Sequence, residues 1–333
     1  MRARAPASAA PGCRHVVRHF RAHPPACQRR PARPRVTPSL ASPLALVCHD
    51  AGPLELLLPW LDLDRLRVRA CLQGPALVLW RRRVGHKLLV DDIDSALDGA
   101  ALLLSGAGWQ SDLEHRARLA AAAQGLHSVA VLDHWVGYAA RFQRDGMRRL
   151  PDELWVCDAE AYALARTTFP GLDVRLQPNQ HLHDLVSRLA PCPDPQRHPA
   201  VLLLPEPIGP AWGGTLPGEE QALNFLLAHA DRLGLPAPLQ LRLRPHDSDP
   251  PGRWNAWMAA QRGQHDVAID VAPTIVDAID RVAWVAGLES THLVLAHAAG
   301  RRAVCLQPPW VPRSRLPQRG LIHLRDLVAA AAA

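Results

Sequence analysis

Apolar and amphipathic segments alternate along the chain in two stretches, from residue 44 to 188 and from residue 201 to 307. The apolar segments are short and continuous, whereas the segments between them have the spacing of an amphipathic helix. Continuous apolar strands are typical of a parallel sheet that helices cover on both faces. Strands that alternate with helices form βαβ units with right-handed crossovers. The pattern therefore predicts an α/β protein built on open parallel sheets.

The predicted elements fall into two series. Strands are predicted at 44–52, 76–80, 99–108, 128–133 and 153–158, and then at 201–208, 239–246, 266–270, 283–287 and 303–307. Helices are predicted at 53–63, 111–125, 159–169, 219–234, 253–263, 274–282 and 290–300. Two such series leave a cleft between the carboxyl ends of two sheets, which is where open α/β folds bind their ligands.

A proline-rich segment separates the two series. Residues 189–200 contain four prolines in twelve positions, which predicts a linker between a domain at 41–188 and a second at 201–333. Residues 1–40 are rich in Arg, Pro and Ala without a sustained period, which predicts a disordered tail. A targeting segment and an arm for nucleic acid or an anionic surface remain alternatives for this tail.

Charge and cysteine content narrow the function classes. The net charge of +7 belongs to residues 1–40, which hold nine Arg and no acid and leave 29 basic and 31 acidic residues in the rest. A body without net positive charge argues against nucleic-acid binding. Seven scattered cysteines without a Cys-x-x-Cys pair argue against a disulfide framework or a zinc site and predict a cytoplasmic protein. The sequence also lacks a membrane-spanning apolar run, so only peripheral membrane association stays open.

The segment 283–300 reads as a strand, a turn and a helix. Ser290 or Thr291 can cap the helix, and Gly300 can end it. The same amides can bind a diphosphate, with Gly287 in the turn and Glu289 accepting hydrogen bonds from sugar hydroxyls. Capping alone is the competing interpretation.

Two further pairs of residues are candidates for function. One pair, in the second half, can bind a phosphate, and the other, in the first half, can supply a catalytic base. Arg244 and His246 end a predicted strand, where a cation stabilises a phosphate; a solvated edge strand is the alternative. Asp133 and His134 follow another strand, where a histidine beside a carboxylate can accept a proton from a hydroxyl. A packed loop is the alternative for this pair.

Glycines and aromatic residues follow three strands of the first half. Asp50 and Gly52 end the first strand, and Gly106 and Gly108 precede Trp109 after another. A glycine at a strand end permits close approach of a ligand, although an ordinary tight turn is the alternative. The incomplete Gly-x-Gly pattern excludes the dinucleotide fingerprint, and Ser111 to Glu114 has the spacing of a capping box. A Trp there can stack on a sugar, and Trp135 is a second candidate.

These motifs together resemble a known family. His49-Asp50-Ala51-Gly52, Arg244-Pro245-His246 and "GLESTHLVLAHAAGRRAVCL" (287–306) are similar to GT-B-type glycosyltransferase-like proteins of bacterial surface-polysaccharide biosynthesis. Relatives in this group include the UDP-sugar 2-epimerases and glycerophosphate transferases, and the resemblance covers roughly residues 44–325. It implies two Rossmann-like domains that face each other across a cleft.

The resemblance also implies a division of roles. The second domain would bind a nucleotide-diphosphate sugar through Arg244, His246 and residues 287–291, and the first would bind a saccharide or lipid-linked acceptor. Asp133 or His134 would be the catalytic base, with no metal and no cofactor. Because His297 stands eight residues after Glu289, the paired glutamates of retaining members are absent. A UDP-sugar 2-epimerase and a catalytically silent nucleotide-sugar-binding or assembly protein are the alternatives.

Overall fold

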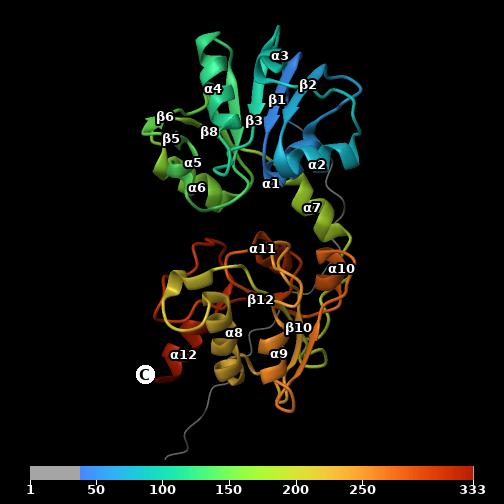
Figure 1. Ribbon diagram of the computed structural model, residues 1–333, viewed down its shortest axis with the longest axis vertical. Coiled ribbons are helices and arrows are strands. Elements are labelled where there is room, and N and C mark those ends of the chain that lie inside the picture. The colour runs from blue at the N-terminus through green and yellow to red at the C-terminus, as the bar shows by residue number, and fades with distance from the viewer. Residues whose placement is uncertain (1–37, 333) are drawn as a thin grey trace, which may run out of the picture. The chain divides into compact units, whose positions relative to one another are not determined.

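The computed structural model describes residues 38–332, apart from the side chain of residue 332 (Figure 1). Predictions for residues 1–37 therefore lie outside the described residues. Six strands of the first half form one sheet: β1 Leu44–Cys48, β2 Val68–Leu72, β3 Leu102–Ser105, β4 Ser128–Val131, β7 Glu153–Val156 and β8 Asp173–Leu176. The strands are parallel throughout and follow the order β2-β1-β3-β4-β7-β8.

The helices of this first half connect consecutive strands. They are α1 Ala51–Leu57, the 3-10 turn η1 Leu58–Trp60, α2 Gly74–Arg83, α3 Ile93–Leu97, α4 Leu113–Ala123, α5 Tyr138–Arg141, α6 Ala159–Thr168 and α7 Gln180–Ser187. A short antiparallel hairpin joins β5 Gln143–Arg144 to β6 Met147–Arg148.

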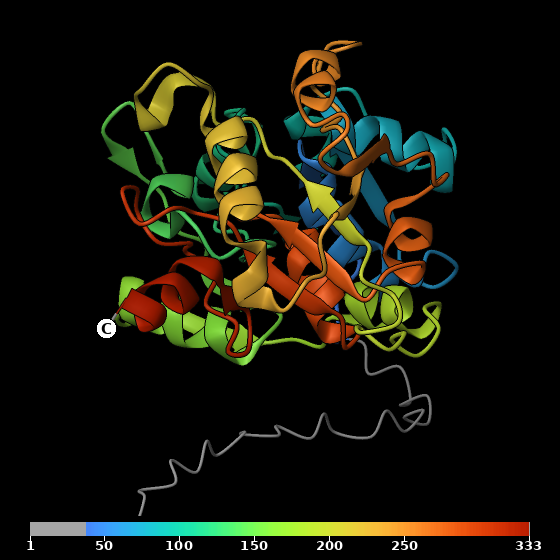
Figure 2. The same cartoon turned by 90° about the horizontal axis from the view of Figure 1, so that it is seen from below.

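A second parallel sheet repeats the design. Its strands are β9 Val201–Leu204, β10 Gln240–Leu243, β11 Asp266–Ile269, β12 Trp284–Gly287, β13 Arg302–Cys305 and β14 Ile322–His323, in the order β11-β10-β9-β12-β13-β14. The helical elements are η2 Gly209–Trp212, α8 Gly218–His229, η3 Ala230–Leu233, α9 Asn255–Ala260, α10 Ile275–Asp280, α11 Thr291–Ala298 and α12 Leu324–Ala332. Helix α8, gold in Figure 2, packs its buried face against this sheet.

Burial explains why these segments adopt their structures. All five residues of β1 are fully buried, as expected of a central strand with helices on both faces. Helix α4 buries Leu113, Ala117 and Ala121, one residue per turn, against Ala45 and Val47 of β1. The two predicted α/β series and their parallel sheets are thus confirmed.

One predicted strand was wrong. Residues 76–80 belong to helix α2, and the strand next to β1 is β2 at 68–72. A short apolar run has no period that separates a strand from a buried helix. Pro75 lies in the first turn of α2, where its missing N–H removes no helical hydrogen bond. Arg69 interrupts the apolar run of β2, which hid that strand from the pattern.

The segment 189–200 carries no helix or strand. It is tied to the second half, because the Asp280 carboxylate accepts the N–H of Ala190 at 2.7 Å and the Pro195 carbonyl accepts the indole N–H of Trp284 at 3.4 Å. The domain boundaries stay a prediction. Among residues 38–332 no helix is both long and apolar enough to cross a bilayer.

Candidate functional site

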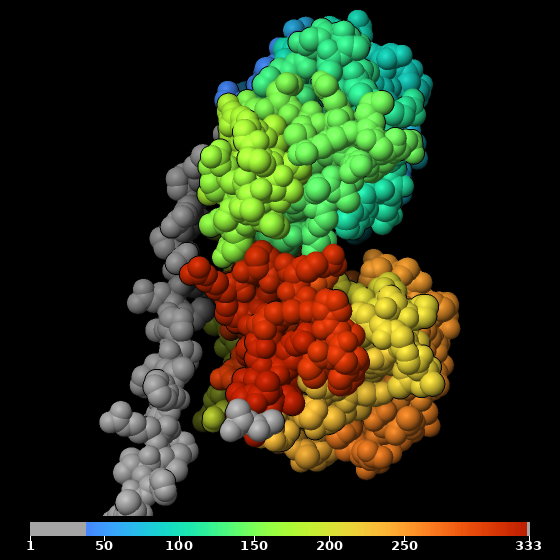
Figure 3. All heavy atoms as spheres, turned by 90° about the vertical axis from the view of Figure 1, so that its left-hand side faces the viewer, coloured from blue at the N-terminus to red at the C-terminus, as the bar shows by residue number. Residues whose placement is uncertain are grey.

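Two adjoining cavities lie where strands of both sheets end. The first, of about 670 Å³, is lined by Asp133 and Trp135 from the first half and by residues of α10 and α11 from the second. The second, of about 310 Å³, contains His134, Glu206, Arg244, His246 and Ser290. Ile275, Thr291 and His292 line both cavities, so the start of α11 stands between them. Figure 3 shows the surface hollowed between the green segments of the first half and the red and yellow segments of the second.

The second cavity brings together four residues that the sequence predicted for donor binding: Arg244, His246, Ser290 and Thr291. Arg244 follows β10, and its Nη1 donates to Asp270 Oδ2 at 2.6 Å and to the Ala272 carbonyl at 3.0 Å. These bonds hold the guanidinium at the cavity wall. The exposed His246 ring meets Ser248 Oγ at 2.8 Å.

The start of α11 has the capping geometry expected of it. Ser290 has extended backbone angles, and its Oγ accepts the N–H of His292 at 3.1 Å. At the other end Gly300 adopts a φ of +77° and donates its N–H to the His297 carbonyl. His292 lines both cavities and is exposed to solvent there. Desolvation by the surrounding protein, followed by the charge of Arg244, lowers the pKa of His292.

Glu206 is a site residue that sequence reasoning missed. It follows β9, and its carboxylate accepts the N–H of Glu289 in the turn before α11. Burial raises the pKa of Glu206 to about 7, the Glu289 charge adds to the rise, and hydrogen bonds from the turn amides oppose it. The protein thus places its own carboxylate on part of the predicted diphosphate site. The Pro205-Glu206-Pro207 sequence at a strand end was the available signal.

Glu289 and Gly287 have structural partners in this turn. The Glu289 carboxylate binds Arg315, accepting the backbone N–H at 2.6 Å and the Nε at 3.0 Å. A Cβ at Gly287 would lie 2.9 Å from the Leu204 carbonyl oxygen, so β9 leaves no room for a side chain there. A direct contact of either residue with a donor stays a prediction.

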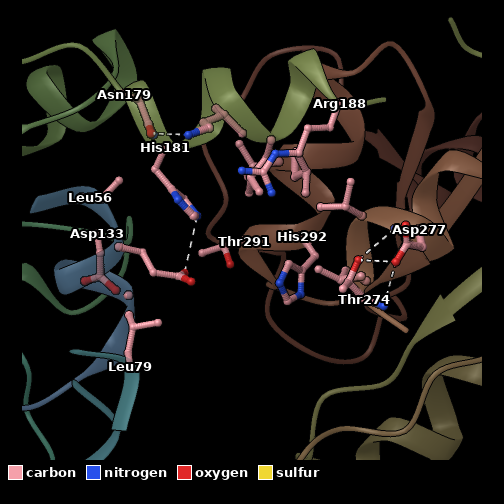
Figure 4. Close-up of a pocket in the computed structure, with 18 of the residues that line it drawn as sticks. Leu56, Leu79, Asp133, Asn179, His181, Arg188, Thr274, Asp277, Thr291 and His292 are labelled. Atoms are coloured by element: carbon pink, nitrogen blue, oxygen red, sulfur yellow. Dashed lines mark hydrogen bonds and ion pairs between the residues drawn. The ribbon is translucent and has the colours of Figure 1, made fainter. Parts of the chain in front are cut away.

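Asp133 is one of the acidic residues that line the first cavity (Figure 4). Its Oδ1 lies 3.4 Å from Nη1 of the buried Arg141. Burial raises the pKa of Asp133, while the charges of Arg141 and His134 oppose that rise. Gly52 completes the packing, because a Cβ there would collide with Asp133 Oδ2.

His134 joins the two halves. Its Nδ1 accepts the N–H of Trp135 at 3.0 Å, which leaves the ring proton on Nε2 to donate to the Glu289 carbonyl at 3.2 Å. Burial lowers the pKa of His134, and Arg141 lowers it further. Both ring nitrogens of a neutral His134 are therefore engaged. The Trp135 indole donates to Asp158 at 2.7 Å, which holds the tryptophan in the cavity wall.

The remaining predicted acceptor residues are absent from the lining of the first cavity: Asp50, Gly106, Gly108 and Trp109. Asp50 Oδ1 meets Nδ1 of His49 at 2.7 Å, and a Cβ at Gly108 would lie 2.5 Å from Asp50 Oδ2. The Arg141 guanidinium lies 4.6 Å from the centre of the Trp109 ring. Trp109 therefore packs against Arg141, and contact of these four residues with an acceptor stays a prediction.

The capping box expected at 111–114 was wrong. Asp112 precedes α4 without a side-chain cap, and Glu114 is buried with its Oε1 accepting the N–H of His49 at 2.9 Å. Oε2 has no hydrogen-bond partner among residues 38–332, and burial raises the pKa of Glu114. The spacing was right for a cap, but the carboxylate serves the β1 turn instead. A true capping box starts α10 at Thr274 and Asp277 (Figure 4).

Comparison with known proteins supports the fold. No protein-family model and no curated protein matches the sequence. Three solved structures are similar over 87% of this chain. UDP-GlcNAc 2-epimerase from Methanocaldococcus jannaschii has a TM-score of 0.59 at 9% identity, with 92% of that chain covered. MnaA from S. aureus, determined with UDP, has a TM-score of 0.55 at 11% identity and 86% coverage. MurG from Acinetobacter baumannii has a TM-score of 0.51 at 12% identity and 91% coverage.

These identities are too low to transfer an activity, but the coverage includes both sheets. Two parallel six-stranded sheets, each with its own helices, occur in the same arrangement over most of the chain. The chain therefore has the GT-B-like fold of two Rossmann-like domains.

Within residues 38–332 no group of three or more His, Cys, Asp or Glu side chains is arranged to hold a metal ion.

Proposed function

We propose that this protein binds a UDP-sugar in the second cavity and transfers its sugar to an acceptor in the first. One observation carries the proposal: Thr291 and His292, at the start of α11, line both cavities. The amides and dipole of a helix start favour a diphosphate. A diphosphate near Thr291 would have Arg244 and His246 on one side and Asp133 on the other.

The solved structures with this fold support the choice of ligand. One of them is a UDP-GlcNAc 2-epimerase, and another was determined with UDP. A nucleoside diphosphate suits the second cavity, because Arg244 offers a fixed guanidinium and His246 an exposed ring. We also propose that the protein acts in surface-polysaccharide biosynthesis and is located in the cytoplasm.

Asp133 is the base that we favour for transfer. It lines the first cavity, and its raised pKa brings a carboxylate closer to the pH at which it must accept a proton. His134 would first have to free its Nδ1 lone pair from the Trp135 N–H, because its Nε2 carries the proton. In the transfer step the acceptor oxygen bonds to the anomeric carbon while Asp133 takes the hydroxyl proton. The bond to the diphosphate oxygen breaks, and its electron pair leaves on the nucleoside diphosphate.

A UDP-sugar 2-epimerase is the second candidate, because two of the similar structures are described by that activity or contain UDP. Both activities use the same cleft, so they differ in product rather than in donor binding. A silent nucleotide-sugar-binding protein would bind the donor without changing it.

Titration calorimetry with UDP, CDP, GDP and UDP-GlcNAc tests donor binding. We expect His246→Ala to weaken UDP binding roughly tenfold through loss of one polar contact. His198→Ala is the matched control, since His198 is an exposed histidine outside both cavities. NMR of incubated UDP-GlcNAc separates hydrolysis or transfer from 2-epimerisation and from no reaction. If the folded wild-type protein binds none of these nucleotides, the donor site does not exist as proposed.

A further inference from the structure

The α2 and α7 side of the first cavity carries basic side chains that donor binding does not explain. Arg82 and Arg83 lie in the last turn of α2, and Arg188 directly follows α7. All three line the cavity together with His181 of α7. Figure 4 shows Arg188 and His181 directed into the same space as Asp133 and Thr291.

Some of the acidic groups in this cavity are already neutralised in the first half. Glu55 Oε1 lies 3.6 Å from Arg83, and its Oε2 lies 3.5 Å from Nε2 of His181. Asp133 is paired with Arg141. Arg83 and the carboxylates of Glu55 and Asp133 therefore already have partners within the protein.

The acids from the second half are engaged locally. Asp280 accepts the Ala190 N–H at 2.7 Å and lies 3.4 Å from Arg301, and Asp277 closes its capping box with Thr274. Neither Arg82 nor Arg188 has a carboxylate within 4.0 Å among residues 38–332. Within the described residues, the exposed Arg82 and Arg188 thus line the cavity without a carboxylate counter-ion.

Two histidines, His181 and His292, line the first cavity together with Arg82 and Arg188. The charges of Arg83 and Arg188 both lower the pKa of His181, after the larger effect of burial and against the charge of Glu55. The charge of His181 contributes to lowering the pKa of His292, and His292 lines both cavities. A molecule held at Arg82 and Arg188 would therefore lie in the same space as Asp133 and near the start of α11.

We propose that the first cavity selects an anionic acceptor, a saccharide that carries a carboxylate or phosphate group, and that Arg82 and Arg188 bind this group. Guanidinium groups suit such anions because two parallel N–H donors match two oxygens. Leu79 and Leu182 line the same cavity and offer apolar surface for a sugar ring. The inference rests on the proposed function, since it names the acceptor class for the same cleft.

The test measures acceptor-side binding with the donor cavity filled. The protein is saturated with UDP and titrated with methyl β-glucuronide, glucose 6-phosphate and the neutral methyl β-glucoside, with NMR detection of the bound sugar. We expect both anionic probes to bind at least tenfold more tightly than the glucoside; a preference for one of them identifies carboxylate or phosphate as the natural group. Arg82→Gln and Arg188→Gln should each reduce anionic binding roughly tenfold and leave glucoside binding unchanged.

Arg262→Gln is the control, because Arg262 is exposed and lines neither cavity. UDP affinity, measured in the same variants, separates the two proposals. Normal UDP binding with no preference for anionic probes, or with no loss in the Arg82 and Arg188 variants, overturns the anionic acceptor alone. A wild-type protein that cannot be saturated with UDP overturns the proposed function instead.

Discussion

Glu206 gives the sharpest test of the site, because its carboxylate competes with the ligand that the site is proposed to bind. Its pKa is raised from an ordinary value of 4.5 to about 7, mainly by burial. The folded protein therefore binds the Glu206 proton more tightly than the unfolded chain does. Folding stability from this group is fully present below pH 4.5 and is lost as the pH rises to about 7.

The magnitude follows from the shift. A difference between 4.5 and about 7 corresponds to about 3 kcal/mol of unfolding free energy at pH 8, at about 1.4 kcal/mol per unit. Glu206 keeps some contact with solvent, so we take this value as an upper limit. Glu206→Gln keeps the shape of the neutral acid and an oxygen for the Glu289 N–H. The variant should differ from the wild type by less than about 1 kcal/mol at pH 5 and be more stable by about 1–3 kcal/mol at pH 8.

Urea unfolding at pH 5, 6, 7 and 8 measures this difference, with Asp64→Asn as the control at an exposed carboxylate. A stability difference that does not change with pH, or a variant less stable than wild type at pH 8, would refute the reasoning. Ligand binding gives a second measure. The diphosphate of UDP-GlcNAc does not titrate between pH 6 and 8, so calorimetry in two buffers should show uptake of up to one proton in the wild type and less in Glu206→Gln.

Three further predictions follow from packing, capping and exposure. Gly52→Ala drives a Cβ into Asp133, and it should abolish turnover while costing about 1–3 kcal/mol of stability; full activity in this variant would show that Asp133 is not the base. Ser290→Ala removes the hydrogen bond to the His292 N–H and should lower unfolding free energy by about 1 kcal/mol, measured by urea denaturation; an unchanged value would mean that water replaces the cap. Limited proteolysis should cut first within 189–200, where residues 196–198 are exposed, and a first cut elsewhere in the described chain would contradict the linker.

Local pattern was enough to predict much of the fold. The uninterrupted apolar residues of β1 and β9 indicated strands buried on both faces, and both are buried in the structure. Ser290 and Gly300 indicated where α11 begins and ends. These features depend on neighbouring residues and on the period of the chain, so the sequence carries them directly.

The errors arose where distant residues decide the outcome. Residues 76–80 are equally apolar in a helix or a strand, and only the position of β2 beside β1 settles their role. Glu114 has the spacing of a cap, yet its carboxylate bonds the N–H of His49, 65 positions away in the chain. Local propensity cannot contain such a contact, because the packing of α4 against the sheet creates it.

The sequence by itself determined the class of fold and the strand ends where polar residues would gather, since parallel strands place all their carboxyl ends at one edge. Only the tertiary structure decided which hydrogen-bond partners those residues have. It set His134 against the carbonyl of Glu289, 155 positions later, and the carboxylate of Glu206 on the amide of the same residue. It also brought Arg82 and Arg188 into the lining of one cavity. Charge, burial and hydrogen-bond competition at the site arise from side chains far apart in sequence, so no local pattern records them.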